Sequence, residues 1–465
     1  MKSKIWSKVT FVVVALVMMA LPLASACAPA AAPPEGEVPV AAKPHVTIHN
    51  IIDLTGAYAP IAIPSEKGGK HFLAWMADQG GLDVDGDGVG DVIVDYRWAE
   101  FGNVDARFMA SYKRFKMETP IIIEMWSSPN QEMLKPIVER DEIPMYGIGF
   151  SDPQLYPPAW NYMDCWSYGE SCAGAIDWYY DEVFEPAHPG ETMQVAHLTW
   201  SSAYGRAGEE PSTRAGENNG KWEVVACEHC LTHPTDPEVM AYLTSFETMG
   251  VDLVWSNTIV NTPAVIMKGL HKLDLYPDMV HSANLWAPAD QVLQINGPAA
   301  SEGYFGPQPV YVPACDTDQA GVKFAKMLHD TYGRGEAWLP NIQYMRGVRM
   351  KANITESVRR ALVGIMDRDG CDLATACDRI TGREVKEMGL QTLAGYECYG
   401  LCPLMGAPAG KDDRRLADKD QIVGVKDGKL VLLSGWYEVP RLIPEEMKAQ
   451  GYFADEEIKY TRTPL

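Results

Sequence analysis

Short β-branched runs alternate with amphipathic segments along this chain, and this alternation constrains the fold more than any other feature of the sequence. The first strand candidates lie at 46–52, 92–96 and 121–125, with amphipathic segments at 72–77 and 106–115 between them. Strands that alternate with helices are typical of βαβ units, in which helices cover both faces of a parallel sheet. The sequence therefore predicts an α/β fold with mostly parallel sheets flanked by helices.

The pattern begins again after an aromatic stretch near Trp166. Further strand candidates lie at 194–198, 222–226, 251–255 and 279–282. A chain of 465 residues, 46% of them hydrophobic, can bury more than one core, because single cores stop growing at about 250 to 300 residues. We expect two α/β lobes. Ligands bind beyond the carboxyl ends of strands in such sheets, so the residues directly after the strands are candidate contacts.

The N-terminus has the features of an export signal. Lys2 and Lys4 precede an apolar run over 11–23, and small residues follow that run. This order is typical of a signal peptide, so we predict that residues 1–26 are removed on export. A single transmembrane helix is the alternative, but the apolar run is short for a bilayer.

Cleavage after Ala26 suits two kinds of signal peptidase. Ala24 and Ala26 fit the ordinary small-residue site, whereas the run Leu-Ala-Ser-Ala before Cys27 resembles a bacterial lipobox whose leucine lies one position early. We favour the lipobox, with Cys27 as the lipidated residue. The Ala- and Pro-rich segment 27–44 then forms a semi-rigid tether. This predicts a location outside the cytoplasm, in the bacterial cell envelope, lipid-anchored to the membrane or periplasmic.

Two observations exclude whole classes of function. Acidic residues outnumber basic ones by 62 to 40, which gives a formal net charge of -22. Such a surface repels nucleic-acid phosphates, so we expect no nucleic-acid partner. The chain also lacks a phosphate-cradling glycine loop, a G-x-S-x-G elbow and an H-E-x-x-H pair, so we expect neither an enzyme nor a catalytic cofactor.

Nine cysteines follow Cys27, and eight of them lie in near pairs. The pairs are Cys165 with Cys172, Cys227 with Cys230, Cys371 with Cys377, and Cys398 with Cys402. Near pairs in an oxidising compartment predict disulfides, although the connectivity stays open. For Cys227 and Cys230, a redox pair or, with His233, a zinc site is the alternative. A redox site needs its own βαβ context and a zinc site needs a fourth ligand, so we favour a disulfide or an unreactive loop.

A series of short motifs runs from His45 almost to Trp436. They are DLTG at 53–56, GG at 80–81, WSS at 126–128, IP at 143–144, GFSDPQL at 149–155, AYG at 203–205, DDRR at 412–415 and VKDGK at 425–429. With this order and spacing, the chain resembles the type I periplasmic solute-binding proteins of the leucine/isoleucine/valine-binding kind, the substrate-binding lipoproteins of ABC transporters.

The resemblance implies two lobes joined by hinge crossovers. Lobe 1 is expected at 45–165 and 305–395, lobe 2 at 166–304 and 396–436, and a C-terminal tail at 437–465. It also implies a monomeric receptor of an ABC importer. By hinge closure, the receptor binds an amino acid, an amide or a carboxylate-bearing compound and delivers it to the permease subunits. An extracytoplasmic sensor for a signalling partner and a secreted hydrolase are the alternatives.

The stretch that begins at Ser128 has the features of a helix start. Ser128 fits the N-cap, Pro129 fits the first helical position, and Gln131 completes a capping box. The free N–H groups at such a start favour an anion. The resemblance implies that Ser128, Ser151 and the backbone of Gly149 hold the carboxylate of a ligand, with helix capping alone as the alternative for Ser128.

The second lobe departs from relatives that bind amino acids. The segments after 255 and 280 lack the tyrosine and the glutamate expected there, and a buried ammonium group needs an acidic partner. A plain α-amino acid is therefore not favoured, unless Asp152 or Asp164 supplies the charge. The other predicted contacts are the polar Tyr204, Asn257 and Asn284, and the aromatic Trp126, Phe150, Trp200 and Trp286, for which ordinary lobe packing is the alternative.

The sharpest local motif is DVDGDGVGD at 83–91. Its ligands fall at the spacing of a calcium loop, with acids at positions one, three, five and nine, a glycine at six and a carbonyl at seven. The predicted ligands are Asp83, Asp85, Asp87, Val89 and Asp91. Val94 replaces the acid usual at position twelve, and a solvated acidic turn is the alternative. We predict a structural calcium, since the loop joins a helix to an edge strand.

Overall fold

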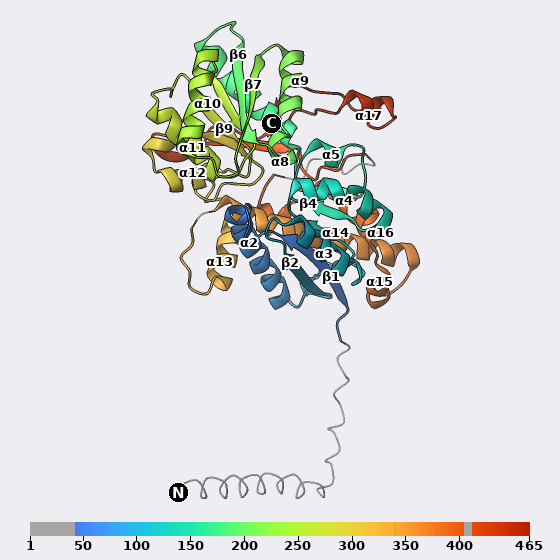
Figure 1. Cartoon of the computed structure of the whole chain (residues 1–465). Helices are drawn as coiled ribbons and strands as arrows, with labels where there is room; N and C mark the ends of the chain where they lie inside the picture. Colours follow the sequence, from blue (N-terminus) through green and yellow to red (C-terminus); the bar gives the residue numbers. More distant parts are fainter. Residues whose placement is uncertain (1–41, 340, 404–411) are drawn as a thin grey trace, which may run out of the picture. The chain divides into compact units, whose positions relative to one another are not determined.

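Two sheets divide the described part of the chain into two lobes (Figure 1). The computed structural model describes residues 42–339, 341–403 and 412–465. The predicted signal peptide, the predicted lipidation site Cys27 and residues 27–41 of the predicted tether lie outside the described residues. Within those residues, no helix is long and apolar enough to cross a bilayer.

Lobe 1 is built on a five-stranded sheet in the order β2-β1-β3-β4-β5, and every neighbouring pair is parallel. Its strands are β1 (His45–Ile52), β2 (Ile93–Glu100), β3 (Ile123–Met125), β4 (Met145–Gly147) and β5 (Asn161–Met163). The helices between them are α2 (Ala59–Asp78), α3 (Asp105–Lys116), α4 (Ser128–Asp141) and α5 (Asp152–Leu155). Ile48, Ile51 and Ile52 of β1 are buried because helices cover both faces of the sheet. The βαβ pattern predicted for this part is confirmed.

The chain returns to lobe 1 near its C-terminal third. There α13 (Ala320–Tyr332) and α14 (Ile342–Asp369) pack against α2. Gly347 makes the contact of α14 with α2 close, because a Cβ atom at this position would lie 1.7 Å from the backbone oxygen of Ser65. Short helical segments complete the lobe: α15 (Leu373–Arg379), α16 (Gly382–Glu384), η3 (Val385–Gly389), η4 (Leu390–Thr392) and η5 (Cys398–Gly400).

Lobe 2 contains the second sheet, in the order β14-β13-β11-β10-β9-β8-β6-β7, with β12 beside β11. Its strands are β6 (Met193–Trp200), β7 (Trp222–Cys230), β8 (Leu253–Ser256), β9 (Val280–Ala283), β10 (Phe305–Gln308), β11 (Lys419–Lys426), β12 (Lys429–Leu432), β13 (Tyr437–Glu438) and β14 (Thr463–Pro464). Its helical segments are α6 (Tyr168–Tyr179), η1 (Tyr180–Phe184), α7 (Glu185–Ala187), α8 (Ala203–Arg206), α9 (Glu209–Asn219), α10 (Asp236–Met249), α11 (Asn261–Lys272), α12 (Ala289–Asn296), η2 (Ala299–Ser301) and, near the C-terminus, α17 (Glu445–Ala449).

The lobe boundaries differ from those that the resemblance implied. Strand β10 lies in the second sheet, because Phe305 pairs with β9 and stacks on Tyr179 of α6 at 5.3 Å between ring centroids. Segment η5 packs against α13 and α14, and so belongs to lobe 1. The expected C-terminal tail is part of lobe 2, since β13 and β14 extend its sheet and Tyr437 is buried.

The predicted disulfides are absent, because the nine cysteines among the described residues are free thiols. Cys227 and Cys230 both belong to β7, where residues three apart point to opposite faces of the sheet. Accordingly, Cys227 is exposed and Cys230 is buried. The sulfur atoms of Cys398 and Cys402 are close enough to form a hydrogen bond, and both residues are free thiols. Near spacing therefore brings Cys398 and Cys402 together but leaves Cys227 and Cys230 on opposite faces of the sheet.

Asp164 and two arginines of α14 hold the crossovers between the lobes together. The Asp164 carboxylate pairs with Arg346 at 3.4 Å and with Arg349 at 3.6 Å, and all three side chains are completely buried. Arg349 also donates to the backbone oxygens of Asp164 at 2.7 Å and Pro309 at 3.1 Å. These oxygens belong to two different crossovers, so one guanidinium group from lobe 1 fixes both.

Replacing Asp164 by asparagine should strongly destabilise the fold. The substitution leaves two buried guanidinium groups without their shared carboxylate, and breaking a buried ion pair from one side costs about 3–5 kcal/mol. Urea unfolding at pH 7 measures the loss. Asp95→Asn is the matched control, because Asp95 pairs with His45 where both side chains are exposed, and such pairs contribute about 0–1 kcal/mol. Equal losses in the two variants would contradict the role of Asp164.

Candidate functional site

Strands from both lobes end at a small cavity lined mainly by aromatic side chains. Lobe 1 contributes Tyr58, Ile61, Trp126, Ser127, Ser128 and Ile148, and lobe 2 contributes Tyr168, Tyr204, Ile259 and Trp286. We call this space the aromatic cavity. Its volume of about 10 Å³ is enough for a single water molecule. Four of the predicted contacts, Trp126, Ser128, Tyr204 and Trp286, lie together here.

Trp286 of lobe 2 contacts aromatic rings of lobe 1 at the aromatic cavity. Its ring stacks on Phe150 of lobe 1, with 5.7 Å between centroids and 9° between planes, and lies 5.6 Å from Trp126. Its indole N–H donates to the hydroxyl of Tyr168 at 2.8 Å. Aromatic pairs at such distances attract each other beyond their shared burial. The protein's own rings therefore occupy the place where a planar ligand would stack.

Tyr204 is held in place by both predicted asparagines. The Asn257 amide donates to the backbone oxygen of Tyr204. The Asn284 oxygen accepts from the Tyr204 hydroxyl at 3.3 Å and from the Trp286 backbone N–H at 2.8 Å, while its amide donates to the Thr258 oxygen at 3.0 Å. Asn257 and Asn284 thus position the aromatic residues of the cavity, and neither side chain lines it.

The tyrosine hydroxyls of the cavity are neutral hydrogen-bond donors. Burial raises the pKa of Tyr58 to about 12 and that of Tyr204 well above its usual value. Burial also raises the pKa of Tyr168, whose hydroxyl lies beside Ser128. No charged side chain is among the described residues that line the cavity. The cavity therefore offers apolar contact and hydroxyl groups to a ligand.

The start of α4 differs from the expected capping pattern. The N-cap is Ser127, not Ser128, and its hydroxyl donates to the Asn130 side chain at 2.7 Å. Gln131 forms no capping box, because its amide turns back to the Met125 backbone oxygen at 2.7 Å. Gly149 packs directly on this turn, where a Cβ atom would lie 2.5 Å from the Ser128 hydroxyl oxygen. Ser128 and Gly149 are therefore brought together, as the sequence predicts.

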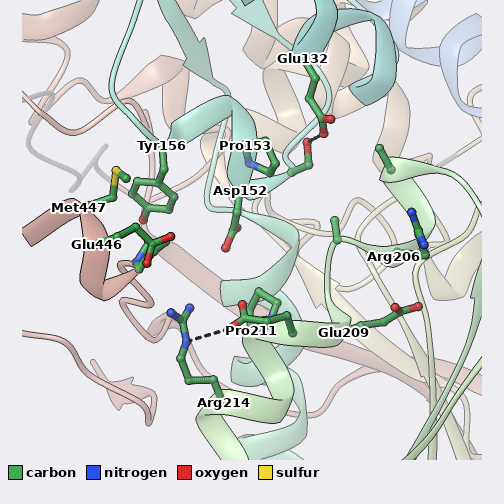
Figure 2. Close-up of a pocket in the computed structure, with 15 residues that line it drawn as sticks. Glu132, Asp152, Pro153, Tyr156, Arg206, Glu209, Pro211, Arg214, Glu446 and Met447 are labelled. Atoms are coloured by element: carbon green, nitrogen blue, oxygen red, sulfur yellow. Dashed lines mark hydrogen bonds and ion pairs between the residues drawn. The ribbon is translucent and has the colours of Figure 1, made fainter. Parts of the chain in front are cut away.

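Ser151 lies in a second, larger space between the lobes (Figure 2). This space, the cleft groove, has a volume of about 570 Å³. It is lined by Glu132 and residues 151–153 and 156 of lobe 1, by residues 203, 206, 207, 209–211 and 214 of lobe 2, and by residues 444, 446 and 447. The Ser151 hydroxyl donates to Glu132, and therefore does not meet Ser128 in the aromatic cavity.

The two acids that could balance an ammonium group have different surroundings. Asp164 already pairs with Arg346 and Arg349. Asp152 points into the cleft groove (Figure 2), and burial together with the charge of Glu170 raises the pKa of Asp152 to about 7. Of the two, only Asp152 therefore faces a space that can take a ligand group.

Arg346 is not among the site residues predicted from the sequence, although it contacts the Trp286 ring of the aromatic cavity. Its guanidinium carbon lies 3.8 Å from the centre of the Trp286 ring and 5.9 Å from that of Phe150. The sequence feature that could have indicated Arg346 is a pair of arginines, three residues apart, within a helical pattern of apolar residues. Such a pair forms one stripe on a helix, and Arg346 and Arg349 are both buried here.

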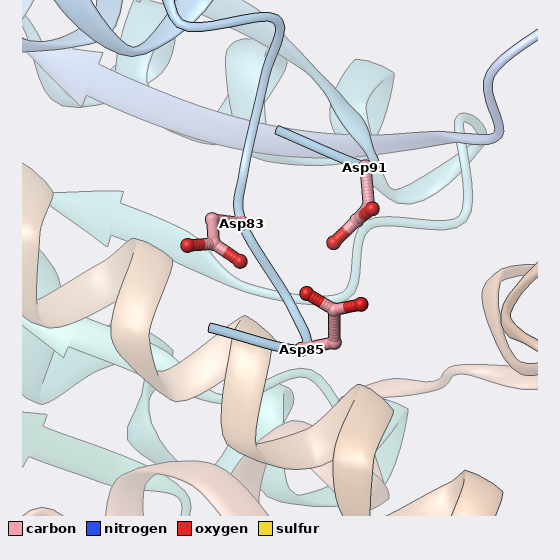
Figure 3. Close-up of side chains that lie close together, drawn as sticks. All are labelled: Asp83, Asp85 and Asp91. Carbon is pink, nitrogen blue, oxygen red and sulfur yellow. The ribbon is translucent and has the colours of Figure 1, made fainter. Parts of the chain in front are cut away.

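The predicted calcium loop brings three of its four aspartates together (Figure 3). Asp83, Asp85 and Asp91 each offer a carboxylate oxygen within 4.8 Å of the others. Asp87 turns to the Val89 backbone N–H at 2.8 Å and is not part of this group. The clustered oxygens are of the type that calcium binds, while the position of Asp87 departs from the predicted ligand set.

Comparison with known proteins found one matching family and many similar structures. The family, described as periplasmic binding protein, matches residues 45–378. A branched-chain amino acid ABC transporter protein from Thermus thermophilus with bound valine is 18% identical, with a TM-score of 0.71 over 85% of this chain and 97% of that chain. A substrate-binding protein from Aeropyrum pernix is 17% identical, with a TM-score of 0.72 over 85% and 96% of the two chains.

A third solved structure has a different ligand class in its description. The fatty acid ABC transporter substrate-binding protein from Thermomonospora curvata is 14% identical, with a TM-score of 0.66 over 85% of this chain and 92% of that chain. The search of curated proteins found no match. These structures share the fold of this chain, and their identities are too low to transfer a ligand.

Replacing Asn284 by aspartate should destabilise lobe 2. A carboxylate cannot donate to the Thr258 oxygen, and leaving a buried polar group without its partner costs about 1–3 kcal/mol. Chemical denaturation measures the change. Asn218→Asp on the exposed surface of α9 is the control, with an expected change within about 0.5 kcal/mol. An unchanged unfolding free energy for the Asn284 variant would show that this amide does not position Tyr204 and Trp286.

Proposed function

Because this chain belongs to the periplasmic binding protein family, we propose that it is the solute-binding receptor of an ABC importer. In this role a small molecule binds between the lobes, the crossovers act as the hinge, and the closed form delivers the ligand to the permease subunits. A ligand drives closure only through its higher affinity for the closed state. The hinge residues Asp164 and Arg349 supply the rigid connection that such a motion requires.

The aromatic cavity is the observation that carries the proposal. It lies at the carboxyl ends of strands from both lobes, where α/β sheets bind ligands. The side chains that line it provide flat apolar surface and hydroxyl groups, without a charge. We infer that it takes the planar or apolar body of a ligand whose polar group bonds to the hydroxyls of Ser128, Tyr168 or Tyr204.

The ligand must replace contacts that the protein now makes with itself. Trp286 stacks on Phe150 and lies against Trp126 across the lobes, and the remaining volume is about 10 Å³. Entry therefore requires that the lobes separate and that Trp286 leaves this stack. A flat ligand body then restores the same kind of ring contact from both sides.

The receptor role requires a location outside the cytoplasm. Residues 1–26 have the features of an export signal, and residues 23–27 resemble a lipobox. We propose that Cys27 carries a lipid anchor, with 27–44 as the tether that separates the binding lobes from the membrane. The protein then acts as a monomer, bound to the membrane next to its permease.

Replacing Trp286 by alanine should weaken ligand binding by roughly thirtyfold, which corresponds to about 2 kcal/mol for a central aromatic contact. A thermal-shift screen with carboxylates, amides, alcohols and aromatic acids first identifies a ligand. Intrinsic tryptophan fluorescence then measures its affinity, since Trp126 and Trp286 line the site.

Trp98→Ala is the matched control, because Trp98 is 42% exposed and lies outside the aromatic cavity. It should leave the affinity within about twofold of wild type. Unchanged affinity in the Trp286 variant would place the ligand elsewhere and overturn the proposal.

We also propose that the loop at 83–91 binds calcium and stabilises lobe 1. Asp83, Asp85 and Asp91 are close enough to share one cation, and their mutual repulsion is lost when it binds. Backbone carbonyls and water would complete the six to eight oxygens that calcium prefers. The loop is closed by the pairing of Leu82 with Val92, on the edge of lobe 1.

Calcium should therefore raise the unfolding free energy by about 2.7 kcal/mol when its concentration is a hundred times the dissociation constant. Chemical denaturation with calcium and with a chelator measures the difference. The double variant Asp83→Asn with Asp85→Asn should lose the response, whereas Asp318→Asn, at a fully exposed aspartate, should keep it. An equal calcium response in the double variant would contradict the site.

A further inference from the structure

The cleft groove is the larger of the two spaces between the lobes. Its volume is about 570 Å³, against about 10 Å³ for the aromatic cavity. Three parts of the chain build its walls: the segment after β4, the segment from α8 to the start of α9, and the C-terminal segment that carries α17. The aromatic cavity is already filled by side chains, so a sizeable ligand group has room only in the groove.

The C-terminal segment contacts both lobes beside the groove. The Phe453 ring contacts Tyr156 edge-on, with 5.6 Å between centroids, and Arg441 lies 3.4 Å from the Tyr156 hydroxyl. Arg441 also pairs with Glu170 of α6 at 3.2 Å. These contacts hold Glu446 at the groove, although the segment lies beyond the part of the chain that the family covers.

The groove has an excess of negative charge. Five carboxylates line it, those of Glu132, Asp152, Glu209, Glu210 and Glu446, together with the guanidinium groups of Arg206 and Arg214. Some of these carboxylates already interact with a nearby basic side chain. Glu209 accepts from His229 at 2.8 Å, and Glu210 lies 3.5 Å from Arg214.

Asp152 differs from the other four acids. Its Oδ1 atom is buried and has no hydrogen-bond partner among the described residues, although the carboxylate also accepts a hydrogen bond from Ser167. Its carboxylate points into the groove (Figure 2). Glu170 and Glu210 add negative charge around it, and Arg214 is the cation that acts on it most. A bound cation stabilises a buried carboxylate most when other negative charges lie nearby, because the cation offsets both the burial and the repulsion.

We propose that the cleft groove receives a positively charged group of the ligand and that Asp152 is the ion-pair partner of this group. The proposal rests on the receptor function and narrows the ligand class. The ligand then has a planar or apolar body for the aromatic cavity and an amine, or another cationic group, that reaches Asp152.

Protonation of Asp152 should couple to this binding. Burial and the charge of Glu170 raise its pKa to about 7, whereas Ser167 and Arg214 act in the opposite direction. The other charged groups that line the groove are Glu132, Glu209, Glu210, Glu446 and Arg206. Only ionised Asp152 attracts a cation, so affinity for a cationic ligand should increase as the pH rises from about 6 to about 8.

Matched amines and alcohols test the proposal. The probes are propylamine with propan-1-ol, benzylamine with benzyl alcohol, and phenethylamine with 2-phenylethanol, measured by titration calorimetry on the mature chain. Within a pair that binds, the amine should bind roughly tenfold tighter than the alcohol. Asp152→Asn should remove this preference and leave the alcohol affinity unchanged, which also shows that the variant is folded. Glu247→Gln, at an exposed acid of α10, should keep the preference.

The outcomes separate this proposal from the receptor function. If an alcohol binds and its amine binds no tighter, or if Asp152→Asn keeps the preference for the amine, the cationic subsite is wrong and the receptor function stands. If neither member of any pair binds, the cationic subsite is overturned, and the receptor function is still decided by the thermal-shift screen. Should the variant not fold, the wild-type pH series decides, because an amine affinity that does not change between pH 6 and 8 contradicts the role of Asp152.

Discussion

The buried ion pair of Asp164 with Arg346 and Arg349 is the constraint on which the rest of the structure depends. Arg349 fixes two crossovers through their backbone oxygens. Arg346 shares the same carboxylate and lies against the Trp286 ring. The hinge and the ring that fills the cleft are therefore linked through one acid. Burying three charged groups is costly unless their geometry is well matched, so breaking these contacts would be costly for the crossovers that they join.

This linkage explains why the aromatic cavity contains so little free space. Trp286 contacts Phe150 and Trp126 of the opposite lobe, and the Arg346 guanidinium makes a cation–π contact with the same ring. The closed form is stabilised by these contacts even without a ligand. A ligand shifts the equilibrium between the open and closed forms further only if its own ring contacts are more favourable than those that Trp286 makes without it. Affinity in such a cleft is decided by shape more than by the number of hydrogen bonds.

The fold and part of the site could be predicted because their signals are local. The strands follow from β-branched runs, and Trp126, Ser128 and Trp286 lie together in the aromatic cavity because each comes soon after the end of a strand. Other features depend on contacts that are remote in sequence. The packing of Arg346 and Arg349 on Asp164 cannot be inferred from a helical pattern in which arginine usually faces solvent. Likewise, the Ser151 hydroxyl turns to Glu132, and β10 joins lobe 2 through Phe305.

The two spaces between the lobes divide the task of recognition by their chemistry. No charged side chain lines the aromatic cavity, so it favours an apolar ligand body that loses little on leaving water. The cleft groove is open and acidic, so it favours a group whose charge balances Asp152. Helix α4 contributes to both spaces, because Ser128 lines the aromatic cavity and Glu132, one turn further along, lines the cleft groove. The same helix therefore sets the positions of a hydroxyl group in one space and of a carboxylate in the other.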